Sequence, residues 1–504
     1  MKYDPPSFKI LVLMAILLIG TVRFTAAVIT WPKAGGGYFN TNFQAMKGDY
    51  SGGFVESYRT DCLPLSSSLT NASTYAQFAV EDINGDGRNE VVVQAYDHVC
   101  AFDGTSGSPL WYYSLDIGLD ATPLLEDVDG DGGTEVVALS RTRDVPGTVK
   151  VVVLRGTDGA LKWSYVLSTS SLSTSSPTAY DLDGDGDMDV LVGCDDDTLY
   201  ALDGGSGLPI WKFGADGDVR VTPAVGNGFI VFSSFTGTVY ALDFSGNTLW
   251  QVSLGDSVWA SPVMGQLDGT GRADVIVATL STGRVVALSG DNGSTLWTYS
   301  MPAGVRTTPV LADMDGDGTP EVVVGDVAGN VRILNALNGT LEQSFSTSPN
   351  TGINPYWGMT AANIYPDAPG LEILITTETV FRYYPNRTFI YSYDGTRLFY
   401  RNNTGDGSTI ADVDNDGCME FITENEDATV PPGQRYSVYD SPTNTGASCG
   451  LLGRDSTGLN VRERETARHV GTAYDLSGRR VPFSTGGKIY IVREKNGVRK
   501  VILR

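Results

Sequence analysis

Five short stretches of this 504-residue chain place acidic side chains at the spacing that a single hard metal ion requires. They read DINGDGRNE from Asp82, DVDGDGGTE from Asp127, DLDGDGDMD from Asp181, DMDGDGTPE from Asp313 and DVDNDGCME from Asp412. Oxygens at positions 1, 3, 5 and 9, with the backbone carbonyl of position 7, can surround one Ca2+, which takes about six to eight oxygen ligands. Glycine at position 6 allows the tight turn that such a loop needs. We therefore predict five calcium sites.

In each loop the residue at position 7 is expected to contribute its backbone carbonyl, and the others their side chains. The predicted metal ligands are Asp82, Asn84, Asp86, Arg88 and Glu90 in the first loop; Asp127, Asp129, Asp131, Gly133 and Glu135 in the second; Asp181, Asp183, Asp185, Asp187 and Asp189 in the third; Asp313, Asp315, Asp317, Thr319 and Glu321 in the fourth; and Asp412, Asp414, Asp416, Cys418 and Glu420 in the fifth.

The residues that follow these loops distinguish them from EF-hands, in which helices flank the loop. Here each loop is followed by an apolar run with the character of a β-strand: EVVVQAY, EVVALS, DVLVGC, EVVVGD and EFITE. We therefore expect the calcium loops to connect β-strands.

The acidic pattern recurs with a regular period. The first three copies begin 45 and 54 residues apart, and 99 residues, or two periods, separate the last two. Degenerate copies fill the gaps: QLDGTGRAD begins at Gln266, NIYPDAPGLE begins at Asn363, and around Ala224 the loop is deleted. The count is then eight units between about residues 75 and 450. A period of about 40–50 residues with several short strands indicates a propeller or a β-solenoid.

A second repeated pattern follows each loop and its strand. It is a Gly-containing turn between an apolar and an aromatic run, as in VCAFDGTSGSPLWYY and LYALDGGSGLPIWKF, and it is a hairpin signal. Each unit then contains four strands, as a propeller blade does. The sixth copy, VRILNALNGTLEQSF, has lost the tryptophan that the others share. We interpret these tryptophans as packing between blades, because each can bury a large area: Trp111, Trp163, Trp211, Trp250 and Trp297.

These two patterns resemble two known repeat families. The YALD…G…LW units resemble repeats of the pyrroloquinoline-quinone-like propeller superfamily, and the DxDGDGxxE loops resemble the FG-GAP/VCBS repeats of integrin α heads and many secreted bacterial proteins. The segment that begins at Trp31 resembles the stretch before such propellers. The resemblance implies an all-β, eight-bladed β-propeller over residues 75–452 with calcium loops at the blade edges, and it does not imply catalysis. Residues 28–74 are expected to pack on the propeller or to close it.

The N-terminus has the pattern of a secretory signal peptide over residues 1–27. Lys2 and Lys9 precede the apolar run ILVLMAILLIG, and the small residues before Val28 offer a cleavage site. The alternative is an uncleaved anchor, but eleven apolar residues are few for a span of about 20. We therefore expect a secreted or cell-surface protein with no stable membrane span after cleavage.

The C-terminal residues 453–504 differ in character from the repeats. The run AYDLSGRRVP, followed by GGKIYIVRE and NGVRKVILR, resembles the end of a type IX secretion sorting domain. The matching residues are Tyr474, Gly478, Arg479, Gly487, Tyr490, Arg493, Gly497 and Lys500. The segment is shorter than such domains, so a plain β-meander that packs on the propeller, or a closing strand, is the alternative. In either case the sequence predicts a short C-terminal β segment.

The composition of the chain argues against several classes of function. The net charge of −24 argues against nucleic-acid binding, which needs a basic surface. The chain has two histidines, His98 and His469, and no vicinal cysteine pair of the kind that quinoprotein dehydrogenases use. We therefore expect that it is not an enzyme. Five cysteines allow one or two disulfides with at least one thiol left over. Cys62 with Cys100 and Cys418 with Cys449 are plausible pairs, and mostly buried thiols, including Cys194, are the alternative.

Two classes of function remain. The first is a non-catalytic extracellular calcium-binding propeller that acts as a cell-surface or filament-forming structural or adhesion subunit, with itself, other surface proteins or glycans as partner. The second is a ligand-binding or quinoprotein-like enzymatic propeller with its site in the central channel. Residues 349–403 are rich in tyrosine, which is typical of interfaces, although an elongated outer hairpin would explain them equally well. Calcium loops together with such an aromatic segment favour the first class.

Overall fold

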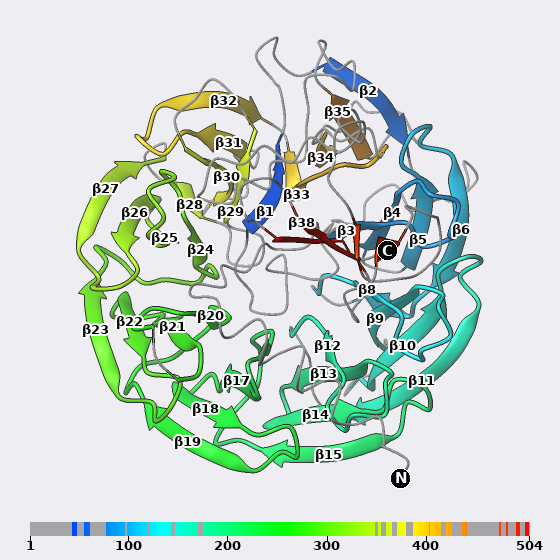
Figure 1. Cartoon of the computed structure of the whole chain (residues 1–504), viewed down its shortest axis with the longest axis horizontal. Coiled ribbons are helices and arrows are strands. Elements are labelled where there is room, and N and C mark those ends of the chain that lie inside the picture. The colour runs from blue at the N-terminus through cyan, green and yellow to red at the C-terminus, as the bar shows by residue number, and fades with distance from the viewer. Residues whose placement is uncertain are drawn as a thin grey trace. The chain divides into compact units, whose positions relative to one another are not determined.

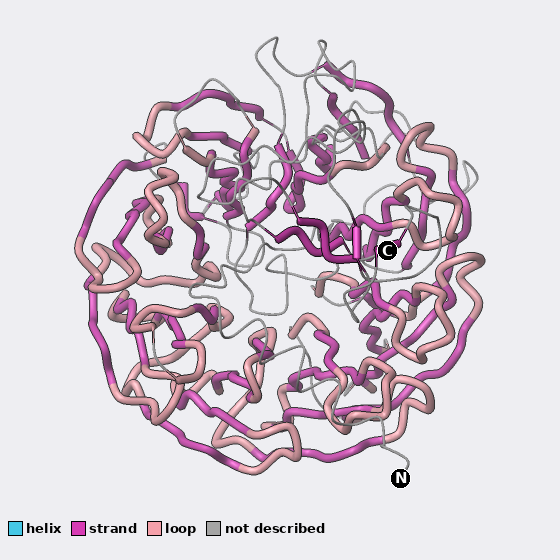
Figure 2. Tube along the Cα trace, viewed as in Figure 1, coloured by secondary structure: helices cyan, strands magenta, loops and turns pink. Residues whose placement is uncertain are grey.

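The chain folds into two compact units, Met1–Leu451 and Leu452–Arg504. A computed structural model describes residues 43–47, 55–60, 77–95, 98–118, 121–142, 147–169, 175–269, 271–347, 351–353, 359–364, 370–379, 387–402, 404–414, 420–425, 436–440, 473–474, 480–481, 490–493 and 499–502. Strands and loops make up these described residues, and no helix occurs among them (Figure 2).

The first unit holds eight sheets in its described residues, which we number as blades 1–8 in chain order. Blade 1 contains β3 (Gln77–Glu81), β4 (Glu90–Ala95), β5 (His98–Asp103) and β6 (Pro109–Ser114), and blade 2 contains β7 (Ile117–Gly118), β8 (Leu124–Glu126), β9 (Glu135–Arg141), β10 (Val149–Arg155) and β11 (Leu161–Ser168). Blade 3 contains β12 (Thr178–Tyr180), β13 (Asp189–Cys194), β14 (Thr198–Leu202) and β15 (Pro209–Gly214), and blade 4 contains β16 (Ala224–Gly226), β17 (Phe229–Ser233), β18 (Thr238–Leu242) and β19 (Thr248–Ser253).

Blades 5–8 repeat the arrangement with additions from the N-terminal segment. Blade 5 contains β20 (Val263–Gly265), β21 (Asp274–Ala278), β22 (Arg284–Leu288) and β23 (Thr295–Ser300), and blade 6 contains β24 (Val310–Ala312), β25 (Glu321–Gly325), β26 (Asn330–Asn335) and β27 (Leu341–Ser346). Blade 7 contains β1 (Phe43–Lys47), β28 (Thr351–Ile353), β29 (Met359–Asn363), β30 (Glu372–Thr379), β31 (Arg387–Tyr391) and β32 (Arg397–Asn402), and blade 8 contains β2 (Val55–Thr60), β33 (Thr404–Ala411), β34 (Glu420–Asn425) and β35 (Tyr436–Asp440).

The strands of each blade follow the burial that their sequences predict. The second strands β4 and β13 are buried at every residue, because both faces of a blade pack against neighbouring blades. The fourth strands β6, β19 and β23 each bury their tryptophan and expose most of their other residues. The apolar core therefore lies between blades, as the cluster that joins residues of blades 3, 4 and 5 illustrates.

Each tryptophan contacts the turn of the following blade. The indole Nε1 of Trp111 donates to the carbonyl oxygen of Gly156 at 2.6 Å, and that of Trp297 donates to Ala336 at 2.8 Å. Trp163, Trp211 and Trp250 make the corresponding hydrogen bonds. Beside Trp297, Gly339 has φ +72°, and a Cβ there would lie 2.6 Å from the indole. The interpretation of these tryptophans as packing between blades is confirmed.

The blade that lacks an acidic loop has a tight hairpin instead. β16 and β17 are joined through Asn227 at φ 50° and Gly228 at φ 84°, and Gly226 pairs with Phe229. Two successive left-handed residues are typical of a two-residue hairpin turn, which favours Asn-Gly. The deletion that the sequence predicted around Ala224 is therefore confirmed.

The edge of the blades away from the acidic loops carries polar contacts between neighbouring blades. The connection from blade 3 to blade 4 places Asp216 beside the turn between β17 and β18. Its carboxylate accepts hydrogen bonds from the hydroxyl groups of Ser234, Thr236 and Thr238 at 2.5, 2.8 and 2.6 Å. The connection and the turn are thus held together by a charge-assisted cluster.

A strand from the N-terminal segment completes the last blade. β2 pairs antiparallel with β35, with Val55 opposite Asp440, so that blade 8 has the order β2-β35-β34-β33. Blade 8 also packs on blade 1, where the Tyr436 ring lies 5.7 Å from that of Phe78. The eight sheets follow one another around a ring (Figure 1), which confirms the predicted all-β, eight-bladed β-propeller.

The second unit contains one small antiparallel sheet in its described residues. Its strands have the order β37-β36-β38-β39, with bounds β36 (Ala473–Tyr474), β37 (Arg480–Val481), β38 (Tyr490–Arg493) and β39 (Arg499–Ile502). Because β36 lies between β37 and β38, this order differs from a simple meander. The resemblance of this segment to a sorting domain stays a prediction.

The predicted signal peptide, residues 1–27, lies outside the described residues. Among the residues that the structure does describe, no helix is long and apolar enough to cross a membrane.

Candidate metal sites in the acidic loops

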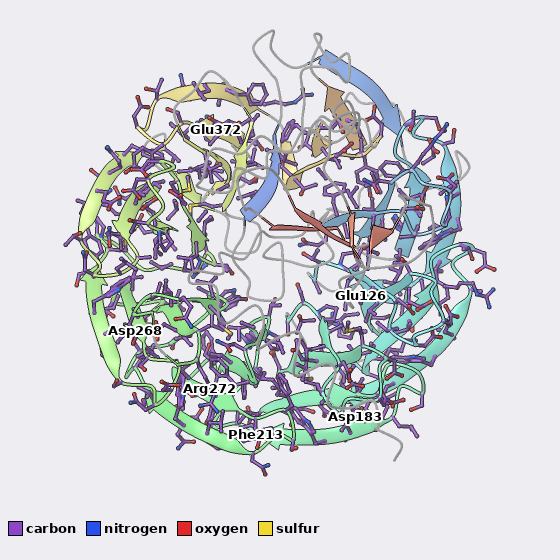
Figure 3. All side chains as sticks on the ribbon, in the orientation of Figure 1. Glu126, Asp183, Phe213, Asp268, Arg272 and Glu372 are labelled. Atoms are coloured by element: carbon purple, nitrogen blue, oxygen red, sulfur yellow. The ribbon has the colours of Figure 1, made fainter. Side chains whose placement is uncertain are left out.

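The five acidic loops occupy the same place in their blades. Each connects the first strand to the second, for example β3 to β4 in blade 1 and β24 to β25 in blade 6. The degenerate copies occupy this place in blades 5 and 7. Figure 3 labels Asp183, Asp268 and Glu372, which belong to three of these loops on different blades.

The acidic residue at position 9 has a structural role that the sequence did not predict. In all five loops its buried carboxylate accepts a hydrogen bond from the backbone N–H of position 2, and we call this hydrogen bond the loop latch. The two atoms are 3.0 Å apart for Ile83 and Glu90, 3.3 Å for Val128 and Glu135, 2.8 Å for Leu182 and Asp189, 2.7 Å for Met314 and Glu321, and 2.7 Å for Val413 and Glu420.

The degenerate loops have the same latch. Leu267 donates to Asp274 at 3.0 Å in blade 5, and Ile364 donates to Glu372 at 2.6 Å in blade 7. Asp274 and Glu372 are 1% and 0% exposed. Because these loops have lost carboxylates at earlier positions, the latch does not depend on a complete set of metal ligands. It holds both ends of each loop on the first and second strands.

Carboxylates near the start of each loop shape the turn. Asp313 accepts hydrogen bonds from the N–H groups of Gly316 and Gly318 at 2.9 and 3.0 Å, and Asp315 accepts one from Asp317 at 3.0 Å. Side chains of Asp and Asn commonly form such turns with the backbone that follows them. Gly316 and Gly318 have φ of 81° and 93°, which glycine adopts at little cost.

Four of the five loops gather carboxylates closely enough to hold one ion. Ligand atoms lie within 4.8 Å of one another in four sets. These sets are Asp127, Asp129, Asp131 and Glu135; Asp181, Asp183 and Asp189; Asp313, Asp315 and Glu321; and Asp412, Asp414 and Glu420. Oxygen-only donor sets of this kind suit hard cations such as Mg2+, Ca2+ and Mn2+.

Other predicted ligands are placed differently. Asp185 and Asp187 lie in a separate acidic group with Asp203, which the sequence analysis had not included. Asp317 is not in the set of the fourth loop, and Asp416 and Cys418 lie outside the described residues. The carbonyl ligands predicted at position 7, Arg88, Gly133, Asp187 and Thr319, stay predictions.

The first loop does not bring three carboxylates this close among its described residues. Position 3 is Asn84, whose amide Nδ2 donates to Glu90 at 2.8 Å. Asp82 accepts hydrogen bonds from Gly85 and Gly87 at 2.8 and 2.9 Å, and Asp86 accepts one from Arg88. The predicted ligands of this loop are therefore engaged in closing the turn.

Burial makes the charged form of the latch carboxylates costly. It raises the pKa of Glu321 to about 8 and that of Glu90 and Asp189 to about 7, and nearby loop carboxylates add to the effect. A cation among these oxygens would favour the charged forms and offset the repulsion between them. The loops of blades 3, 6 and 8 therefore fit a divalent cation in donor type and arrangement.

The second loop already contains a positively charged group. The ammonium group of Lys162, on β11, lies 2.9 Å from Glu135 Oε1 and 3.2 Å from Asp131 Oδ2, and it contacts Asp129 most closely. Burial lowers the pKa of Lys162, but its hydrogen bonds to Asp129 and Glu135 outweigh this and raise it overall. The sequence signal for this contact was the Lys in LKW, where other units have an apolar residue before Trp.

A second polar cluster lies where three blades begin, at the edge opposite the loops. Arg220, Trp259 and Arg306 each stand four residues before the first strand of blades 4, 5 and 6. The guanidinium groups lie 5.4 and 5.9 Å from the Trp259 ring, within reach of cation–π attraction. Asp195 binds Arg220 through two 3.0 Å hydrogen bonds. Arg306 is exposed and, within the described part of the chain, makes no hydrogen bond or ion pair.

The cysteines and histidines show one covalent feature. Cys100 is in a disulfide whose partner lies outside the described residues, and Cys194 is buried as a free thiol. His98 is fully buried and its ring stacks on that of Tyr112 at 5.3 Å. His469 lies outside the described residues.

Comparison with known proteins supports the two kinds of repeat. A PQQ-type family model described as outer membrane protein assembly factor BamB matches residues 181–328, and an FG-GAP-like repeat model matches residues 127–192. The chain therefore carries PQQ-like and FG-GAP-like repeats, which confirms that part of the resemblance. No match was found among curated proteins.

Solved structures share the fold at low identity. A quinohemoprotein alcohol dehydrogenase from Pseudomonas putida HK5 matches with TM-score 0.57 and 11% identity, over 82% of this chain and 80% of that one. One from Comamonas testosteroni matches with TM-score 0.55 and 13% identity, over 90% and 84%. BamB from Moraxella catarrhalis has 22% identity and TM-score 0.43, over 63% and 83%. At these identities the likeness to the two dehydrogenases shows the propeller fold alone.

Proposed function

We propose that this chain is an exported, non-catalytic calcium-binding propeller that serves as a structural or adhesion subunit at a cell surface or in an extracellular filament. The observation that carries the proposal is the convergence of three carboxylates, one of them the buried latch residue, in each of the loops of blades 3, 6 and 8. The carboxylates within each set repel one another without a cation. Calcium is millimolar outside cells, and this concentration fills sites whose affinity is too low to bind calcium in the cytosol.

Two further features support export. The disulfide at Cys100 would persist only in an oxidising compartment, and the N-terminal pattern is that of a signal peptide. The resemblance of the C-terminal segment to a type IX sorting domain agrees with export to a cell surface.

Thermal unfolding with and without calcium tests the metal component. Calcium at about 100 times Kd would stabilise the folded state by about 2.7 kcal/mol per site, so EGTA should lower the midpoint by many degrees. Asp313→Ala should remove one calcium site in titration calorimetry. The matched control is Asp268→Ala in the degenerate loop of blade 5, which should leave the number of sites unchanged. A midpoint that EGTA does not move would refute calcium stabilisation.

Assembly is tested separately on the mature protein. A closed propeller has no free strand edge, so self-association would use surfaces outside the blade ladders, and a head-to-tail contact would build a filament. Electron microscopy and light scattering in about 1 mM calcium should show oligomers or fibres. Monomers at high concentration under these conditions would refute the assembly role.

The cluster at Trp259 favours a second candidate function, the binding of an anionic aromatic ligand near the inner ends of the blades. An exposed guanidinium at Arg306 and an aromatic face beside it suit a flat carboxylate, and pyrroloquinoline quinone is such a molecule. Titration with this quinone should quench tryptophan fluorescence, and Arg306→Ala should weaken the binding at least tenfold. Lys212→Ala, which removes a charge elsewhere, is the control. Equal binding by all three proteins, or no binding, would exclude this candidate.

A further inference from the structure

Lys162 lies among the carboxylates of the second loop in the manner of a bound cation. Its Nζ contacts one oxygen each of Asp129, Asp131 and Glu135, three of the four residues whose ligand atoms gather in this loop. The Lys162 side chain is 17% exposed and that of Glu135 is 1% exposed, so the contact between these two residues is largely shielded from water. These three residues are among those that a metal ion in this loop would use.

The position of Lys162 has equivalents in blades 1 and 3–6, and none of these five residues is a lysine or an arginine. The residue precedes the tryptophan of the fourth strand, and that tryptophan pairs with Val153 in blade 2 and with an alanine in blades 1, 3, 4 and 5. The equivalent residues are Leu110, Ile210, Leu249, Leu296 and, in blade 6, Glu342.

A lysine and a divalent cation cannot share this loop at low cost. Calcium ligands lie about 2.3–2.6 Å from the ion, so an ion on the same oxygens would stand close to the ammonium group and repel it. Calcium would have to displace Lys162 before binding. In the loop of blade 6, by contrast, the equivalent position adds the carboxylate of Glu342, whose charge acts on Glu321.

We propose that Lys162 is the built-in cation of the second loop, and that it closes this loop without metal and prevents calcium from binding there at micromolar concentrations. The inference rests on the proposed function, because it takes calcium as the ion of the other loops. The second loop still contains the full set of acidic ligands in addition to the lysine. One of their oxygens, Asp127 Oδ1, is buried and has no hydrogen-bond partner among the described residues. Removal of the ammonium group should therefore uncover a calcium site.

Calcium titration of the folded full-length protein tests the proposal. Lys162→Met removes the charge but keeps the apolar stem, and it should bind one more calcium ion per chain than the wild type, by calorimetry and native mass spectrometry. Lys162→Arg keeps the charge and should bind the same number as the wild type. Lys212→Met is the matched control: Lys212 lies over the rings of Tyr200 and Tyr165 and not in a loop, so its loss should add no site.

A second measurement keeps the proposal testable if Lys162→Met folds poorly. In EGTA, Lys162→Met and the milder Lys162→Gln should both unfold at lower temperature than Lys212→Met, and calcium should remove this difference. Equal calcium numbers in wild type and both Lys162 variants would overturn this inference and leave the proposed function standing. Absence of calcium binding by every protein, together with no effect of EGTA, would overturn both.

Discussion

Asp274 offers the most direct test of the loop latch, because its loop has lost the carboxylate at position 1. The side chain is 1% exposed and accepts three backbone hydrogen bonds, from Leu267 and Asp268 at 3.0 Å and from Gly290 at 3.1 Å. Gly290 belongs to the turn after β22, so one carboxylate ties the loop to two parts of the blade. Asp274→Ala would leave all three N–H groups without this acceptor.

The expected loss of stability follows from these contacts. Hydrogen bonds to a charged group contribute about 1.5–3 kcal/mol each, and three of them would sum to well above 4 kcal/mol. Burial opposes this by raising the pKa of Asp274, which reflects the cost of a charge away from water. We therefore expect Asp274→Ala to lower the free energy of unfolding by about 3–5 kcal/mol. Asp274→Asn keeps one acceptor oxygen and should lose about 1–2 kcal/mol.

Urea unfolding followed by tryptophan fluorescence measures this free energy, and it should be run in EGTA and in calcium. The loss should be the same in both, because the latch acts on the backbone and not through a metal. Asp268→Ala, a change at an exposed carboxylate of the same loop, is the control and should stay within about 0.5 kcal/mol of the wild type. A loss that occurs only in calcium would refute the latch and assign Asp274 to a metal site.

Three other perturbations have clear expected outcomes. Gly339→Ala would place a Cβ 2.6 Å from Trp297 and should lower the unfolding midpoint more than the control Gly255→Ala. At Gly255 φ is also positive, but no atom lies within 4 Å of the added Cβ. Equal shifts of the midpoint would argue against tight packing of this tryptophan. Burial alone would raise the pKa of Asp216, but its three hydroxyl partners lower it to about 2, below the unfolded value. Its stabilisation is thus present above about pH 4 and lost as the pH falls towards 2, so Asp216→Asn should be less stable than the wild type at pH 7 and equal to it near pH 2. Deletion of residues 31–60 removes β1 and β2, exposes the edges of β29 and β35, and should yield aggregates in size-exclusion chromatography. A monodisperse and equally stable product would contradict these two pairings.

The sequence was enough to predict most of the ring. Blades 1–6 are each built from strands that are neighbours in the chain, so the period of the acidic loops and the Gly–Trp turns determines blade number and strand order there, whereas β1 and β2 join blades 7 and 8 from the N-terminal segment. The deletion around Ala224 was recognisable because Asn-Gly specifies a two-residue hairpin. The tryptophan contacts followed from five equivalent positions, since a side chain that recurs once per unit must meet the same neighbour each time.

The loop chemistry was harder to predict, because it depends on side chains that reach across strands. Lys162 acts on a loop that begins 35 residues earlier, and Asp203 joins Asp185 and Asp187 from the turn between two later strands. Neither contact has a signal within the nine-residue pattern. The latch did have one: QLDGTGRAD and NIYPDAPGLE both end in an acidic residue although their other carboxylates are reduced in number, which separates the final acidic residue of the loop from metal binding.

The pairing of β2 with β35 sets a time order for biosynthesis. The two strands are separated by 375 residues, from Thr60 to Tyr436, and both must be available before the eighth blade is complete. At about 5–20 residues per second, a ribosome needs about 20–75 s to make the intervening chain. Throughout that interval β2 has no β35 to pair with, and the ring of blades cannot close. Export of a still-unfolded chain would let closure take place only after delivery, when the whole length is present at once.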